Sequence, residues 1–106
     1  MSWPDIVFSE ADKARFKQMA EELEQKLEIE CQTVKSLVAF VNYPPLVEAI
    51  RLAKEEKINK PLGLPNMNYW YFESPAAGWF QSTAKGARSL SIFLSAIEGF
   101  PYELME

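Results

Sequence analysis

Histidine is absent from the chain, and cysteine occurs only once among its 106 residues. Because histidine is the commonest general base and metal ligand, the usual centre of acid–base catalysis and of metal binding is missing. Cys31 alone can form neither an intrachain disulfide nor a zinc site of the usual nitrogen–sulfur type. We therefore expect a protein that is not an enzyme, binds no metal or cofactor, and resides in the cytoplasm, a reducing compartment.

Basic clusters and long apolar runs are also lacking. The 15 acidic and 11 basic residues give a net charge of −4, which argues against direct binding of nucleic acid. The longest apolar-rich stretch near the C-terminus, residues 90–97, is far shorter than the roughly 20 residues that span a bilayer. Residues 1–5 do not have the basic and then apolar pattern of a signal peptide. We expect a soluble protein with no membrane partner.

Helix-breaking residues are missing from the first part of the chain, with no glycine before Gly63 and no proline between Pro4 and Pro44. Ser9 and Asp12 have the spacing of a capping box at a helix start. From there to residue 42, apolar side chains recur at the helical spacing of about 3.6 residues: Phe16, Ala20, Leu23, Leu27, Cys31, Val34, Val38 and Val41. This pattern predicts one long helix over residues 9–42.

Two alternatives to an unbroken helix remain open. The helix could break near residues 28–31 and fold back on itself. Residues 27–34 also alternate between apolar and polar, which is typical of a half-buried strand. A small sheet formed from residues 27–34 and 68–73 would then make the fold α+β rather than all-α.

Prolines and glycines divide the rest of the chain. Pro44 and Pro45 favour the start of a short second helix, and residues 58–68 have the composition of a loop. Residues 68–73 are expected to be extended. Ser74-Pro75 and Gly99 mark the two ends of a C-terminal helix. The prediction is a single all-α domain over residues 1–106, with three to four helices.

Two features of the later part of the chain suggest close contacts. Gly78, Ser82 and Gly86 recur every four residues, which predicts a ridge where another helix can approach closely. Six of the 14 aromatic residues fall within twelve positions: Tyr69, Trp70, Tyr71, Phe72, Trp79 and Phe80. Tyrosine and tryptophan dominate interface hot spots, so we predict that these six form a partner-binding surface. The competing interpretation is that they cover the core, where large aromatics usually lie.

The expected helix length favours a dimer. A helix over residues 9–42 would span roughly 50 Å, whereas a compact chain of this size is only about 35 Å across. Its apolar stripe would be covered by a second copy in a homodimer, or the helix would break within a monomeric bundle. The favoured function is a protein–protein interaction module that acts as an adaptor, regulator or inhibitor. The alternatives are a small-molecule-binding protein or minor enzyme with a pocket of Tyr69, Tyr71 and Trp79, or a structural subunit of a phage or viral assembly.

Overall fold

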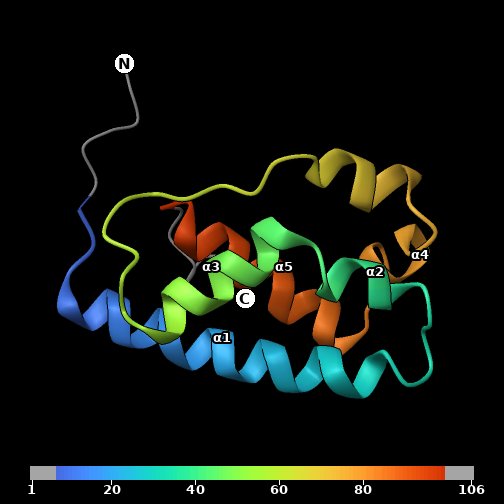
Figure 1. Ribbon diagram of the computed structural model, residues 1–106, viewed down its shortest axis with the longest axis horizontal. Coiled ribbons are helices and arrows are strands. Elements are labelled where there is room, and N and C mark those ends of the chain that lie inside the picture. Colours follow the sequence, from blue (N-terminus) through green and yellow to red (C-terminus); the bar gives the residue numbers. More distant parts are fainter. Residues whose placement is uncertain (1–6, 100–106) are drawn as a thin grey trace.

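The computed structural model describes residues 7–99, and every regular element in that range is helical (Figure 1). The elements are α1 (Glu10–Glu30), α2 (Leu37–Val41), α3 (Pro44–Lys54), the π-helical turn η1 (Tyr69–Glu73), α4 (Ala77–Phe80) and α5 (Lys85–Ile97). The all-α prediction is confirmed. The alternative sheet from residues 27–34 and 68–73 is wrong, because both segments are turns or helix.

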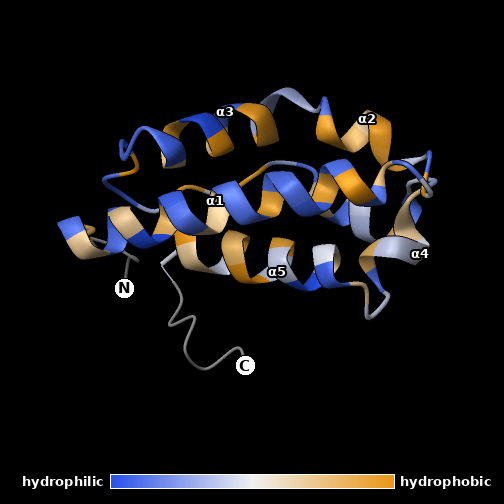
Figure 2. Ribbon diagram, turned by 90° about the horizontal axis from the view of Figure 1, so that it is seen from below, coloured by the Kyte–Doolittle hydropathy of each residue, from blue (hydrophilic) through white to orange (hydrophobic). Residues whose placement is uncertain are grey.

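Helix α1 begins where the sequence indicates. The Asp12 amide donates to Ser9 Oγ at 3.1 Å, and the Ser9 amide donates to the Asp12 carboxylate at 3.0 Å, which completes the capping box. The 21 residues of α1 span about 32 Å, so the helix fits within the longest molecular dimension of 38 Å. Both α3 and α5 pack against α1, which lies between them in Figure 2.

The predicted continuation of this helix to residue 42 is wrong, and the break falls at the position considered as the alternative. The last turn tightens as the amides of Gln32 and Thr33 donate to carbonyls three residues back. The chain then reverses direction and enters α2 (Figure 1). Leu37 and Phe40 of α2 are fully buried. Four of the six residues from 31 to 36 are Cys, Thr, Val and Ser, which are weaker helix formers than the residues that dominate α1, and the reversal brings Leu37 and Phe40 into the core.

The second helix agrees with the prediction from its two prolines. Helix α3 has Pro44 and Pro45 in its first turn, where an amide hydrogen has no helical partner to lose. The connection that follows runs back along the molecule to η1 (Figure 1). It is joined to both ends of the described chain, since the Leu62 amide donates to the Ile97 carbonyl at 2.8 Å and the Asn59 carbonyl accepts from the Phe8 amide at 3.0 Å.

Residues 69–73 form a π-helical turn, so the expectation of an extended segment is wrong. The Ser74 amide donates to the Tyr69 carbonyl, five residues earlier, at 2.8 Å. The Ser74 hydroxyl also donates to the Trp70 carbonyl at 2.7 Å. This wider turn directs Trp70 to Phe40, with ring centroids 5.1 Å apart. Aromatic packing against the core therefore decides the conformation of the segment.

The single C-terminal helix expected after Ser74-Pro75 is also wrong, because it is divided into α4 and α5. The Ser82 hydroxyl donates to the Trp79 carbonyl at 2.6 Å and accepts from the Ala84 amide at 3.2 Å. Serine side chains that bond to nearby backbone in this way compete with helical hydrogen bonds. Trp79 and Phe80 of α4 are both buried, which fixes this short helix to the core independently of α5.

The N-terminus of α5 is capped by a side chain from α1. The Glu30 carboxylate accepts from the Gly86 amide at 2.6 Å and from the Trp79 indole N–H at 2.5 Å. Ala84, the N-cap residue of α5, contributes no side-chain hydrogen bond. One carboxylate thereby joins α1, α4 and α5.

The glycine ridge predicted for a helix crossing is not formed. Gly86 is close to the Glu30 side chain rather than to the backbone of another helix, and Gly78 lies in a different helix, α4.

Candidate functional site

The six aromatic residues that the sequence placed on a partner-binding surface are divided between core and surface. Trp79 and Phe80 are buried. Trp70 and Tyr71 are half-buried. Tyr69 and Phe72 remain exposed, at 45% and 67% of their surface. The exposed pair lies three residues apart on one turn, not on alternate faces of a strand.

Contacts beneath the surface explain this division. The Trp70 ring lies against Tyr43 as well as Phe40, and the centroids of the Trp70 and Tyr43 rings are 5.4 Å apart. The Tyr71 hydroxyl shares a hydrogen bond with Ser91 Oγ at 3.0 Å. Trp70 and Tyr71 therefore attach the turn to the helices below. Of these six residues, only Tyr69 and Phe72 offer a substantial aromatic surface to a partner, and their role in binding stays a prediction.

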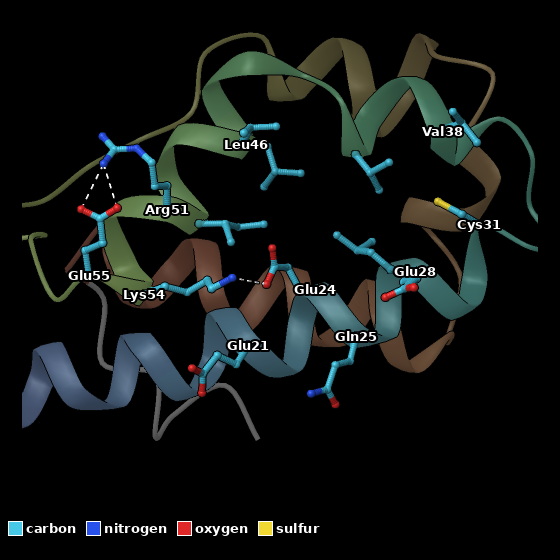
Figure 3. Close-up of a pocket in the computed structure, with 14 residues that line it drawn as sticks. Glu21, Glu24, Gln25, Glu28, Cys31, Val38, Leu46, Arg51, Lys54 and Glu55 are labelled. Carbon is cyan, nitrogen blue, oxygen red and sulfur yellow. Dashed lines mark hydrogen bonds and ion pairs between the residues drawn. The ribbon is translucent and has the colours of Figure 1, made fainter.

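A groove lies between α1 on one side and α2 and α3 on the other (Figure 3). This groove has a volume of about 1160 Å³. Its walls combine apolar side chains with charged side chains at the edges. The lining residues are Glu21, Glu24, Gln25, Leu27, Glu28, Cys31, Val38, Val41, Leu46, Val47, Ile50, Arg51, Lys54 and Glu55.

The floor of the groove is apolar. Leu27, Leu46 and Ile50 line it and belong to the buried core, so they themselves offer almost no exposed surface to a partner. Val38 and Val47 stand at the edge with 46% and 49% of their surface exposed. Two β-branched apolar side chains with half of their surface in water, beside a buried apolar floor, form the kind of exposed patch that marks interaction sites.

One end of the groove is crossed by an ion pair. Lys54 Nζ lies 2.8 Å from Glu24 Oε1 and links α3 to α1 (Figure 3). The hydrogen bond with Glu24 raises the pKa of Lys54. Beside it, the Arg51 guanidinium bonds to Glu48 and, at 3.0 Å, to Glu55. The hydrogen bond from Arg51 lowers the pKa of the Glu48 carboxyl.

The α1 side of the groove carries two carboxylates without such partners. Glu21 and Glu28 line the groove and form no direct ion pair with any residue between 7 and 99, although Glu21 lies near enough to Lys54 to help raise the pKa of that amine. They are seven positions apart, so they stand about two turns from each other on the same face of α1. The groove is therefore apolar at its base and negative along one side.

Cys31 lies at the end of α1 and contributes its thiol to the groove wall. Burial raises the pKa of this thiol, and the neighbouring Glu30 carboxylate raises it further, while Lys35 acts in the opposite direction. The neutral thiol is a poor nucleophile. Cys31 is suited to be part of an apolar wall, as its place in the apolar stripe predicted.

A second, smaller cavity of about 290 Å³ lies beside η1 and α5. Tyr71 lines it, together with Ser91 and the Glu98 carboxyl, whose pKa is raised by burial. Tyr69 and Trp79 do not line it. This cavity is therefore not the small-molecule pocket predicted from Tyr69, Tyr71 and Trp79, and that pocket stays a prediction.

The groove was not predicted from the sequence. Its walls come from three separate segments, and Val38 and Cys31 were both assigned to the stripe of a continuous helix. A signal was present in Val47, an apolar residue one position after the buried Leu46 of α3. Such a residue lies off the core face of its helix, although an isolated exposed valine is common and needs no explanation.

Residues 7–99 include no group of three carboxylate or thiol side chains placed to hold a metal ion. Over the same range, no helix has both the length and the apolar character needed to cross a membrane. A scan of family models and searches of curated proteins and solved structures found no match to this chain.

Proposed function

We propose that this protein is a non-catalytic protein-binding module that holds a segment of its partner in the groove between α1 and α2–α3. The proposal depends on one observation, the half-exposed pair Val38 and Val47 above a buried apolar floor. Covering this surface with a partner would remove apolar area from water, which is the main source of affinity in most protein association. A reducing, cytoplasmic location is proposed with it, on the basis of the single cysteine.

The dimensions of the groove favour a polypeptide over a small molecule. Small-molecule sites are typically about 300–1,000 Å³ in volume and enclose most of their ligand. The groove is about as large as the upper end of this range, but it does not enclose a ligand, since Val38 and Val47 at its edge are open to water. A metabolite would leave much of such a surface uncovered, whereas a peptide segment would extend along it.

The homodimer expected from an unbroken helix has lost its main support. With α1 ending at Glu30, its apolar residues Phe16, Ala20, Leu23 and Leu27 are covered by the rest of the same chain. A second copy therefore enters the proposal only as one possible occupant of the groove. The exposed pair Tyr69 and Phe72 is the second candidate surface for the same function.

Cys31 offers a direct test, because it is the only cysteine of the chain and lies in the groove wall. A benzophenone maleimide on Cys31 should cross-link a partner protein in a lysate of the native host. Replacing both edge valines, Val38→Gln with Val47→Gln, should abolish the cross-link while circular dichroism stays unchanged. The control carries the probe at position 73 instead, through Cys31→Ser and Glu73→Cys, and should not give the same product.

The outcomes separate the alternatives. A cross-link that persists in the double glutamine variant, or that forms equally from position 73, would contradict the groove as the binding surface. A product of twice the chain mass from Cys31 would identify a second copy as the occupant. A partner that is lost on Tyr69→Ala with Phe72→Ala, but not on the valine changes, would move the function to the aromatic surface.

A further inference from the structure

We infer that the groove receives an amphipathic helix with basic residues beside its apolar face. This inference rests on the proposed function and specifies the chemistry of the partner. Three properties of the groove carry it, namely its charge, the spacing of its unpaired carboxylates, and the hydrogen bonding of its walls.

The charge of the groove is negative after its own ion pairs are taken into account. Four glutamates and two cations line it, which is a net charge of −2. Both cations are already paired, Arg51 with Glu48 and Glu55 and Lys54 with Glu24. A partner therefore meets the carboxylates of Glu21 and Glu28 as charges without a direct ion pair in residues 7–99, Glu21 being partly offset by the nearby Lys54. The chain as a whole, with its net charge of −4, attracts a basic partner over longer distances.

The spacing of these carboxylates fits one face of a helix. Glu21 and Glu28 are separated by seven residues along α1, a rise of about 10 Å. Two lysines seven residues apart on a helix lying alongside α1 would have the same separation. Leucines three and four positions from those lysines would then point to the apolar part of the groove, where Val38 and Val47 are half exposed. One helix face thus matches the two charges and the exposed valines together.

The walls also favour a helix over an extended segment. Peptides that bind as strands obtain much of their affinity from main-chain hydrogen bonds to a free sheet edge. The groove is walled by three helices, α1, α2 and α3, whose backbone groups bond within their own helices, and residues 7–99 contain no strand. A helix satisfies its own main chain and needs only side-chain contacts. The groove side of α1 from Glu21 to Cys31 is about 15 Å long, equal to roughly three turns of such a helix.

A second copy of this chain fits the groove less well. The helices of residues 7–99 bury their apolar faces in the core, at Leu46, Ala49 and Ile50 in α3 and at Leu90, Phe93 and Leu94 in α5. None of them presents a free apolar face with lysine or arginine on both sides. Helix α1 itself adds further carboxylates, so another copy would bring like charges toward the groove.

The test uses designed peptides with the full chain. The first probe is a fluorescein-labelled peptide of about 14 residues, or roughly four turns, with leucines on one face and lysines beside them. The second has glutamate in place of every lysine, and the third has the lysine composition in scrambled order. Fluorescence anisotropy measures binding of each peptide at low and high salt. The lysine peptide should bind at least about tenfold more tightly than either of the other two at low salt, and its affinity should fall as salt screens the ion pairs.

Matched variants show which residues of the protein bind the lysine peptide. Glu21→Gln with Glu28→Gln should weaken the lysine peptide by about three- to tenfold, as expected for the loss of two surface ion pairs. Glu22→Gln with Glu73→Gln removes the same charge outside the groove lining and should change the affinity less than about twofold. Val38→Gln with Val47→Gln should reduce binding of the lysine peptide without changing the charge. The bound peptide should also slow alkylation of Cys31, a readout that contact elsewhere would not affect.

Several results would overturn the inference. Equal binding of lysine and glutamate peptides would remove the role of charge, and equal binding of the scrambled peptide would remove the role of the helical face. An equal loss in the two glutamine pairs would place the charge effect outside the groove. If Cys31 cross-links a host protein in a groove-dependent manner while the lysine peptide shows no preference, the inference fails and the proposed function stands. If the peptide binds as expected but no host protein is captured through the groove, the proposed function fails instead.

Discussion

The contact between Glu30 and Gly86 allows a sharp test of how this fold is held together. The Glu30 carboxylate is the acceptor for both the Gly86 amide and the Trp79 indole, at 2.6 and 2.5 Å. These two donors belong to α5 and α4, while Glu30 is the last residue of α1. Replacing Glu30 with alanine would leave both donors without a protein partner.

The size of the effect follows from the bonds that are lost. A hydrogen bond to a charged group contributes about 1.5–3 kcal/mol, and a carboxylate at a helix N-terminus adds about 0.3–1 kcal/mol. Glu30 is only half-buried, so hydrogen bonds to water can replace part of the lost stabilisation. We expect Glu30→Ala to lower the free energy of unfolding by about 2–3 kcal/mol, equivalent to a fall in Tm of about 8–15 °C for a domain of this size.

A second substitution makes the test specific. A Cβ atom added to Gly86 would lie 2.1 Å from Glu30 Oε2 and 3.0 Å from Trp79 Cζ2. Gly86→Ala must therefore displace the carboxylate, and we expect a loss of about 1–2 kcal/mol even though alanine is favoured over glycine in a helix by about 1 kcal/mol. In the Glu30→Ala background most of this clash is gone, so the same change should be nearly neutral. Gly78→Ala is the control, because nothing lies within 4 Å of its added Cβ.

Urea denaturation, followed by circular dichroism and tryptophan fluorescence, gives the free energies for this double-mutant cycle. The two substitutions should be less than additive by about 1–2 kcal/mol, since they act on one contact. Strict additivity, or a cost of Gly78→Ala equal to that of Gly86→Ala, would refute the role assigned to the Glu30 carboxylate.

Three further predictions concern α1, the aromatic residues and the thiol. Ser9→Ala should cost about 1 kcal/mol in urea denaturation because it removes the capping box, whereas Ser36→Ala, at a helix start without a side-chain bond, should cost almost nothing. Phe80→Ala should cost about 3–5 kcal/mol, and Phe72→Ala less than about 0.5 kcal/mol, because only Phe80 is buried; equal costs would contradict the division of the aromatic residues. Alkylation of Cys31 by iodoacetamide should be slow at pH 7 and accelerate with a midpoint above the ordinary thiol pKa, since burial raises the pKa of Cys31. A midpoint at or below the ordinary value would show that the thiol is not shielded.

The starts of α1 and α3 were predicted well from the sequence because their causes are local. The capping box of Ser9 and Asp12, and the two prolines at the start of α3, act on backbone groups within four residues of themselves. Hydrophobic periodicity also identified the buried face of α1, including Phe16 and Leu27. These signals are sufficient to predict an all-α protein.

Features that depend on distant contacts were not predicted. No local signal separates Trp79 and Phe80, which are buried, from the neighbouring Phe72, which is exposed. The glycine pattern predicted a helix crossing, whereas the group that lies closest to Gly86 is a carboxylate 56 positions earlier in the chain. The groove has the same origin, because its two walls meet only after the chain reverses direction beyond Glu30.

The break after Glu30 is the decisive case, and it can be tested separately. Residues 31–36 contain no glycine or proline, so their own preferences do not require a helix to end there. If burial of Leu37 and Phe40 causes the break, a peptide of residues 9–42 in a helix-promoting alcohol should be helical through residues 31–36, as judged by its Cα chemical shifts. In the intact protein the same residues should show turn-like shifts. A break at Glu30 in the isolated peptide would instead assign it to local bonds, such as the one that the Thr33 hydroxyl donates to the Glu30 carbonyl at 3.3 Å, and the position of the groove would then be encoded within α1 itself.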